Sequence, residues 1–349
     1  PKSGVYLAMN KITIIGLGLV GNSIGMAIKR AAVEPVGDYP APPAQGVRVT
    51  GFDPSRDREA AALRRHNSVD EIAPDLRRAV QGAELVVLAT PVSAVREVME
   101  AIAPFLEDGA TVTDTLPAKE QVMSWARELL GPNVGFVGGH PMSTSVDLSL
   151  ASDEAAPGPD LFYKAHYCIL PAPRAGSEAL NRVIWLAEIM GAQPWFVDVL
   201  EHDSFVAAAS QLPALASANL LRITAGGSTW SDMSVFAGEQ YDSVIAPLET
   251  NPERLTEGLL SNRAALVRWL DQYILSMHEL REMLAGSERD ALLDAMQRAH
   301  TAQTSHANRS ERDNQLRAEL REAIQDSRPS RGLMGGYISD RVFRRKDQK

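Results

Sequence analysis

Two groups of residues have types and spacing that could bind or transform a small molecule. The first is a glycine cluster with G-x-G-x-x-G spacing at 16–21, which follows the apolar run 11–15 and opens a helical pattern. The first glycine of such a cluster permits a tight turn, the second lets backbone approach a pyrophosphate, and the third allows close helix packing. Amide groups at the helix start attract anions. We predict a dinucleotide site formed by Gly16, Gly18, Leu19, Val20 and Gly21; the alternative is a structural glycine turn.

The second strand-like run ends at Asp53, which bears on the choice of dinucleotide. An acidic residue at this place hydrogen-bonds ribose hydroxyls and repels a 2′-phosphate. This favours NAD. NADP stays open because Arg56 could meet a phosphate, and Asp53 could instead cap the next helix.

The second group is His140 in the run Gly138-Gly139-His140-Pro141-Met142. It follows a strand-like run, as do Ala89-Thr90-Pro91 and Asp114-Thr115. In parallel sheets, ligands gather beyond the carboxyl ends of the strands. We therefore expect Thr90 and Pro91 to line the cofactor and His140 to lie where cofactor and substrate meet.

The elements that must position these residues change character near residue 198. Short apolar runs alternate with amphipathic stretches from 11 to 198, which predicts an α/β, Rossmann-type, mostly parallel sheet. Long helical patterns follow at 201–224 and 252–284, the second with one continuous apolar face running from Leu259 to Leu284. Neighbouring helices or a second subunit must bury that face. We predict a nucleotide-binding domain at 9–198, an all-helical dimerisation and substrate domain at 199–326, and a tail at 327–349.

Composition narrows the partners. The net charge of −9 over 349 residues argues against nucleic acid, and no apolar run reaches the length of a membrane span. We expect a cytoplasmic homodimer that binds a small molecule, with residues 1–8, before Met9, left out of the fold. The single cysteine, Cys168, is interpreted as a buried small hydrophobe.

The other polar candidates have ordinary structural interpretations. His202 lies in the run Glu201-His202-Asp203 at the start of a long helical pattern, where Glu201 and Asp203 suit the N-terminal dipole, so we favour a capping interpretation over a catalytic one. Asp114 could help to set the nicotinamide loop, and Lys119 could face a substrate carboxylate. A capping role for Asp114 and a solvated Lys119 are equally ordinary interpretations. No histidine pair has convincing metal spacing, so no metal is predicted.

Four motifs in order resemble the prephenate and arogenate dehydrogenases: GLGLVGNSIG at 16–25, AELVVLATPV at 83–92, FVGGHPM at 136–142 and EHDSFVAAASQLP at 201–213. The resemblance implies a Rossmann domain joined to a helical dimerisation domain. It also implies NAD-dependent oxidative decarboxylation of prephenate or arogenate in tyrosine biosynthesis. His140 matches the family's catalytic histidine, which takes the hydroxyl proton as hydride departs. Ser145 matches a hydroxyl-bearing position that helps to hold the substrate.

The chain also departs from the family pattern at several positions that grip substrate. A serine is replaced by Pro117, two histidines by Gln211 and Ala214, an arginine by Ser234, and a glutamate by Val146. Two alternatives therefore stay open: a related dehydrogenase for another cyclohexadienyl-type substrate, and a dinucleotide-binding protein without catalysis.

Overall fold

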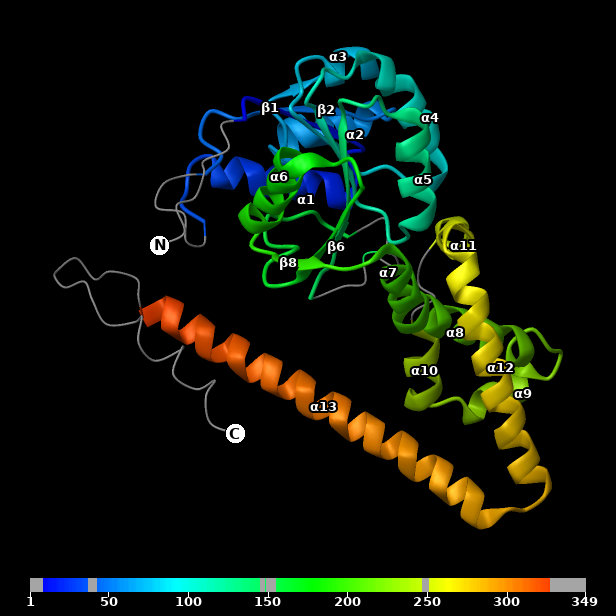
Figure 1. The fold of residues 1–349 in the computed structure, drawn as a ribbon. Coiled ribbons are helices and arrows are strands. Elements are labelled where there is room, and N and C mark those ends of the chain that lie inside the picture. Colours follow the sequence, from blue (N-terminus) through cyan, green and yellow to red (C-terminus); the bar gives the residue numbers. More distant parts are fainter. Residues whose placement is uncertain (1–8, 37–42, 145–147, 149–154, 247–250, 327–349) are drawn as a thin grey trace. The chain divides into compact units, whose positions relative to one another are not determined.

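The structure is a computed structural model that describes residues 9–36, 43–144, 148, 155–246 and 251–326 (Figure 1). Two compact units divide the chain, Pro1–Tyr273 and Ile274–Lys349. The sheet and all of the candidate site residues that the structure describes belong to the first unit. The predicted tail at 327–349 lies outside the described residues.

An eight-stranded sheet forms the centre of the first unit, in the order β3-β2-β1-β4-β5-β6-β7-β8. All neighbouring strands are parallel except β6 and β7, which are antiparallel. This confirms the predicted α/β class and its mostly parallel sheet. The strands are β1 (Lys11–Ile15), β2 (Arg48–Phe52), β3 (Glu71–Ile72), β4 (Leu85–Leu88), β5 (Thr111–Asp114), β6 (Gly135–Pro141), β7 (His166–Pro171) and β8 (Gln193–Phe196).

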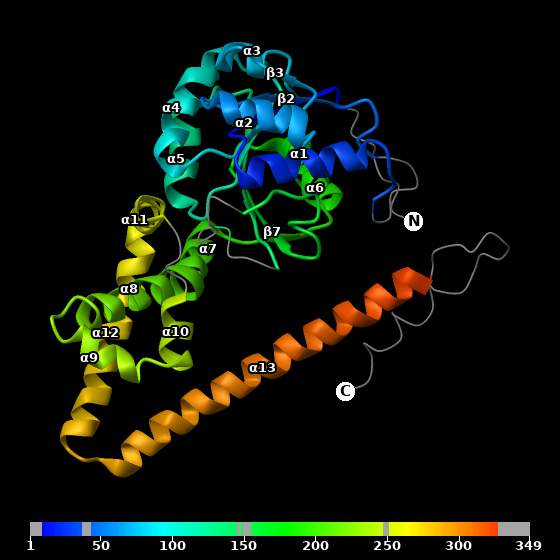
Figure 2. The ribbon, with the colours of Figure 1, turned by 180° about the vertical axis from the view of Figure 1, so that it is seen from behind.

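Helices cover both faces of this sheet, which explains why central strands such as β4 and β5 are buried along their whole length. One buried cluster joins the sheet to α1 and α6, and a second joins it to α3, α4 and α5 (Figures 1 and 2). These elements, with the short α2, are α1 (Leu19–Ala31), α2 (Arg56–Ala60), α3 (Leu76–Val80), α4 (Val92–Ile102), α5 (Glu120–Leu129) and α6 (Gly176–Ile189).

The rest of the described chain is helical, as predicted. A π-helical segment, Ala207–Gln211, joins α7 to α8, so that helical structure runs from Val199 to Thr224. The helices are α7 (Val199–Val206), α8 (Leu212–Thr224), α9 (Trp230–Met233), α10 (Glu239–Ile245), α11 (Pro252–Ser261), α12 (Arg263–Ala285) and α13 (Arg289–Asp326).

The expectation of one continuous helix face over 252–284 is wrong, because the helix is interrupted at Asn262. The buried Asn262 side chain donates to the Asp203 carbonyl and to Gln211 Oε1, both at 2.8 Å. The break thus turns an amide towards α7 and the π-helical segment. Beyond it, Leu266 is buried, whereas Ile274, Met277 and Leu284 are about half or more exposed in the single chain.

Candidate active site

Four parallel strands bring the predicted site residues to one edge of the sheet. β1, β4, β5 and β6 are neighbours and run the same way, so their carboxyl ends meet there. Gly16 follows β1, Thr90 follows β4, Asp114 ends β5, and His140 is the penultimate residue of β6. The structure therefore brings together residues that lie up to 124 positions apart in the sequence, from 16 to 140.

The glycine loop has room for a ligand at only one of its three glycines. Gly16 has a φ of +98°, and a Cβ there would lie 2.4 Å from the Ala89 carbonyl oxygen. A Cβ on Gly21 would lie 1.9 Å from the carbonyl oxygen of Gly16. A Cβ on Gly18, by contrast, would meet no described atom within 4 Å. Packing thus dictates the first and third glycines, and the second leaves open space for a bound group.

The start of α1 borders this space and suits an anion. Gly18 is the N-cap of α1, no side chain caps the helix, and its first turn, which begins with Leu19 and Val20, holds no acidic residue. The helix therefore presents backbone amides and a partial positive charge without a competing carboxylate.

Asp53 ties the glycine loop to the end of β2. Its Oδ2 accepts the Leu17 amide at 2.8 Å, and its Oδ1 accepts the Ser55 amide at 2.9 Å. The cap of the following helix is Ser55 rather than Asp53, since the Ser55 hydroxyl accepts from Arg58 N. Each carboxylate oxygen has lone pairs beyond its hydrogen bond from one backbone amide, so Asp53 retains capacity for a ribose hydroxyl.

Thr90 offers a further sign that the loop holds a polar ligand. Its buried hydroxyl finds no hydrogen-bond partner among the described residues, although buried polar groups nearly always have one. Thr90 lies beside Gly16, and Pro91 is the N-cap of α4. The open space at Gly18, the uncapped α1 and the unpaired Thr90 hydroxyl together fit a dinucleotide.

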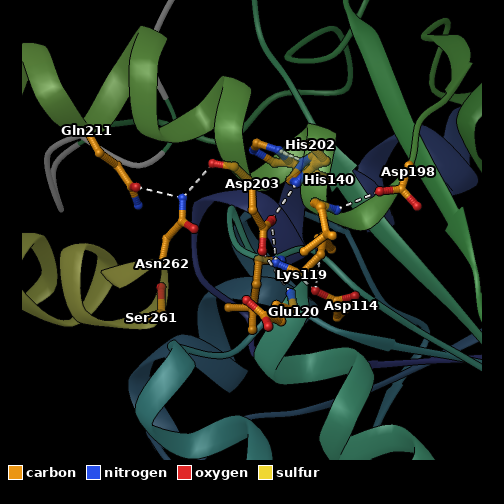
Figure 3. A network of polar contacts seen from close by, with 12 residues as sticks. Asp114, Lys119, Glu120, His140, Asp198, His202, Asp203, Gln211, Ser261 and Asn262 are labelled. Carbon is orange, nitrogen blue, oxygen red and sulfur yellow. Dashed lines mark hydrogen bonds and ion pairs between the residues drawn. The ribbon is translucent and has the colours of Figure 1, made fainter. Parts of the chain in front are cut away.

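His140 is the first member of a chain of hydrogen bonds that reaches α7 (Figure 3). His140 Nδ1 lies 2.9 Å from His202 Nε2, and His202 Nδ1 lies 2.8 Å from Asp203 Oδ1. The Asp203 carboxylate also accepts the amides of Lys119 at 2.8 Å and Glu120 at 2.9 Å. The carboxylate is therefore held in place by the loop and helix that follow β5.

This chain fixes which nitrogen of His140 can act as a base. Asp203 as a carboxylate only accepts, so His202 donates from Nδ1 and its Nε2 must accept from His140 Nδ1–H. His140 Nε2 is then left with a lone pair. Because His140 lines a cavity, that lone pair is available to a bound molecule.

The surroundings also keep His140 uncharged. Burial lowers the pKa of His140 well below its usual value, because it removes water from the imidazolium, and the nearby His202 and Lys119 lower the pKa further. The ring is therefore neutral at neutral pH, as a base must be before it accepts a proton.

Lys119 lies fully buried beneath this histidine. Its ammonium pairs with Asp114 and donates to the carbonyl of Gly139 at 2.6 Å. Burial lowers the pKa of Lys119, and the Asp114 carboxylate opposes that shift. The interpretation of a solvated lysine is wrong: Lys119 holds the ends of β5 and β6 together directly before His140.

The glycine before His140 is required by space. A Cβ on Gly139 would lie 2.3 Å from the Tyr167 hydroxyl and 2.7 Å from the carbonyl oxygen of Asp114. Only a residue without a side chain lets β6 pass between β5 and β7 at this point. Position 139 therefore requires glycine for packing, and position 140, directly after it, carries the imidazole.

A cavity of about 880 Å³ opens beside His140. Its walls are largely apolar and aromatic, and no lysine or arginine is among the described residues that line it. Burial raises the pKa of the Cys168 thiol on this wall to about 11. The lining includes Pro117, His140, Met142, Cys168, Trp195, His202, Phe205, Ser210 and Trp269.

Some of the positions at which the family grips substrate line this cavity and others do not. Pro117 lines it, whereas Gln211 is buried and donates to the Gly258 carbonyl at 2.9 Å, outside the described lining. Ser145 and Val146 lie outside the described residues.

The capping interpretation of His202 and its neighbours is wrong. The N-cap of α7 is Asp198, which accepts the Leu200 amide at 2.9 Å, and both His202 and Asp203 are buried. The available signal was an adjacent His-Asp pair directly after the last strand of the sheet. Cys168 is buried, as predicted, and it also faces the cavity.

Two family models match the chain in succession. Residues 43–195 match the prephenate dehydrogenase nucleotide-binding domain, and residues 198–298 match the prephenate dehydrogenase dimerization domain. The two matches together cover well over half of the chain. They meet between β8 and α7.

Individual relatives agree with the two models. A prephenate dehydrogenase of Bacillus subtilis is 27% identical over 285 residues, covering 80% of this chain and 72% of the relative. A cyclohexadienyl dehydrogenase of Zymomonas mobilis is 27% identical over 296 residues, covering 83% and 94%.

Solved structures have the same fold. The Synechocystis arogenate dehydrogenase is 25% identical with a TM-score of 0.69, covering 85% of this chain and 99% of its own. The Aquifex aeolicus prephenate dehydrogenase, solved with hydroxyphenyl propionate and NAD+, is 19% identical with a TM-score of 0.72, covering 86% and 99%, and supports the fold alone. The glycine loop, the histidine at the sheet edge and the matches to both domain models lead to one conclusion: this chain belongs to the prephenate dehydrogenase family.

Proposed function

We propose that the protein catalyses the NAD-dependent oxidative decarboxylation of prephenate or arogenate in tyrosine biosynthesis. The observation that carries the proposal is the neutral His140, oriented by His202 and Asp203 at the carboxyl edge of the sheet and facing a cavity. Relatives named prephenate, cyclohexadienyl and arogenate dehydrogenases support this reaction class.

Eight residues have assigned roles in cofactor binding. The bound nicotinamide supplies the hydride acceptor. Gly16, Gly18, Leu19, Val20 and Gly21 surround the pyrophosphate, Thr90 and Pro91 border the cofactor beyond β4, and Asp53 accepts ribose hydroxyls. The carboxylate of Asp53 disfavours a 2′-phosphate, so we propose NAD as the cofactor over NADP.

His140 carries the proton transfer. Its Nε2 accepts the proton of the ring hydroxyl as the C–H bond at the same carbon loses hydride, so that carbon becomes a carbonyl carbon. Loss of the ring carboxylate as carbon dioxide then leaves its bonding electrons in the ring, which becomes aromatic. The positive charge that develops on His140 is shared with His202 through the Nδ1 bond and is stabilised by the Asp203 carboxylate.

The cavity walls suit the ring of the substrate better than its carboxylates. Trp195 and Phe205 stack with centroids 6.3 Å apart, and Trp269 is fixed by a 3.0 Å bond from Nε1 to the Ser204 hydroxyl. Rigid aromatic walls favour a six-membered ring. Because no cation is among the described lining residues, we propose that ring contacts and His140 dominate substrate binding.

The protein also self-associates in this proposal, as the dimerization-domain match supports. The helical stretch Val199–Thr224 is long and apolar enough to cross a membrane by length and composition alone. It carries His202 and Asp203, whose bonds to β6 and to the loop after β5 attach it to the sheet, so we assign its exposed apolar surface to a dimer.

The same proposal includes a domain boundary near residue 198 and a cytoplasmic location. It also includes the absence of nucleic-acid and membrane partners.

The test measures NADH formation with prephenate and with arogenate, alongside NAD binding by calorimetry. Reduction of NAD with either substrate, lost in His140→Asn while NAD still binds, supports the proposal. NAD binding without turnover of either substrate would contradict it and would favour a dinucleotide-binding protein without catalysis.

A further inference from the structure

Three potential metal ligands converge on one wall of the cavity. The antiparallel register of β6 and β7 places Cys168 directly opposite His140, and α7 brings His202 to the same point. One ligand atom from each residue lies within 4.8 Å of the other two. The group draws on two neighbouring strands and a helix, so the fold fixes it more firmly than a loop would.

The chemistry of this group matches a soft divalent cation. Two imidazoles and a thiolate are ligands that Zn²⁺ prefers, with distances of about 2.0–2.1 Å to nitrogen and about 2.3 Å to sulfur. A tetrahedral ion with such bonds places two nitrogens about 3.3 Å apart. The present separation of His140 Nδ1 and His202 Nε2 is 2.9 Å, so a small rotation of the rings suffices.

The neighbouring charges favour the ion on balance. His202 donates its other nitrogen to the Asp203 carboxylate, which is the arrangement that orients metal-binding histidines in many proteins. Lys119 is the opposing charge, and its ammonium is paired with Asp114. All three ligand residues line the cavity, so the fourth coordination position is open to water or a bound molecule.

We propose that His140, Cys168 and His202 bind one Zn²⁺ per chain. The ion takes the place of the proton between the two histidines, and that proton moves from His140 Nδ1 to His140 Nε2. The Cys168 thiol releases its proton when the ion binds. The ion occupies His140 Nδ1 and breaks the bond to His202, which removes the orientation that catalysis requires. The site is thus an inhibitory metal site built into the catalytic wall, and the inhibitory effect, unlike the binding, rests on the proposed function.

The binding test uses Co²⁺ as a spectroscopic probe on the full, tag-free chain without substrate. Wild type should bind one Co²⁺, with the strong visible bands of tetrahedral coordination and a thiolate-to-cobalt charge-transfer band. Cys168→Ser should lose the charge-transfer band, and both Cys168→Ser and His202→Phe should weaken binding at least tenfold. His166→Gln, a histidine on β7 outside the ligand group, should bind as wild type does. Circular dichroism confirms that each variant is folded.

Two results would overturn the site: absence of tetrahedral Co²⁺ bands in the folded wild type, or full binding in Cys168→Ser and His202→Phe. Zn²⁺ should displace Co²⁺ and, at full occupancy, abolish NADH formation. Undiminished turnover of the loaded protein would overturn the inhibitory effect. If the protein reduces NAD with neither substrate, the proposed function fails while the binding measurement still decides the metal site.

Discussion

Replacing His202 tests whether the hydrogen-bond chain prepares His140 for catalysis. His202→Phe keeps a planar ring but removes the acceptor for His140 Nδ1 and the donor to Asp203. His202→Gln restores both, because its amide oxygen can accept from His140 while its amide nitrogen donates to Asp203. The two variants therefore separate the loss of hydrogen bonding from the loss of the imidazole itself.

The expected magnitude follows from the groups left unpaired. His202→Phe leaves His140 Nδ1 without its partner, whereas Asp203 keeps its bonds from the Lys119 and Glu120 amides. A buried donor without a partner costs about 1–3 kcal/mol, which corresponds to about a 5- to 150-fold loss in kcat if the cost falls on the transition state. His202→Gln should recover kcat to within about fivefold of wild type.

Steady-state NADH formation gives kcat and KM, calorimetry gives NAD affinity, and thermal unfolding gives stability. A positioning role for His202 requires kcat to fall while NAD affinity stays within about twofold, since the glycine loop is untouched. Glu201→Gln, an exposed change on the same turn of α7, is the matched control. An unchanged kcat in His202→Phe, or a kcat in His202→Gln as low as in His202→Phe, would refute a positioning role for His202.

Four other outcomes are expected. The neutral form of His140 is the active one and its pKa is lowered, so kcat/KM should stay level as pH falls through 6.5 and decline only well below it; a decline centred at 6.5 or above would contradict this. His140→Asn should lower kcat by about 100- to 10,000-fold and leave NAD binding intact, and equal loss of both would indicate a structural role. Asp53→Asn should narrow the preference for NAD over NADP in binding titrations and lower the free energy of unfolding by about 1–3 kcal/mol, because one backbone amide loses its acceptor; an unchanged preference would remove Asp53 from cofactor selection. Light scattering should give twice the chain mass of 37.8 kDa at micromolar concentration, and a monomer would contradict the proposed dimer.

The sheet half of the site could be predicted because local sequence determines it. A glycine spacing dictates the turn after β1, and the parallel-strand rule places residues such as Thr90 and His140 at a shared edge without knowledge of any contact. Gly16 and Gly21 illustrate this, since their close approaches to neighbouring backbone are the reason for the motif. The role of each residue in binding remains a prediction.

The helical half could not be predicted in the same way. Its contacts join residues 62 positions apart, as for His140 and His202, and depend on how α7 packs against the sheet. The burial of Lys119 and the antiparallel register that places Cys168 opposite His140 are likewise tertiary facts. The sequence pattern of one helix reports the capping and periodicity of that helix and not its contacts with the sheet. An adjacent His-Asp pair is therefore compatible with a capping interpretation and with a catalytic one.

The two family models meet at residues 195–198, and that junction passes through the middle of the hydrogen-bond chain. His140 lies on one side of it, while His202 and Asp203 lie on the other, yet all three belong to one compact unit. The boundary between the two domain models therefore divides the hydrogen-bonded group of His140, His202 and Asp203. A chimera joined at this seam from two relatives would take the residue at position 140 from one parent and those at 202 and 203 from the other. A crossover placed beyond α7 would leave His140 and its two partners in the same parental segment.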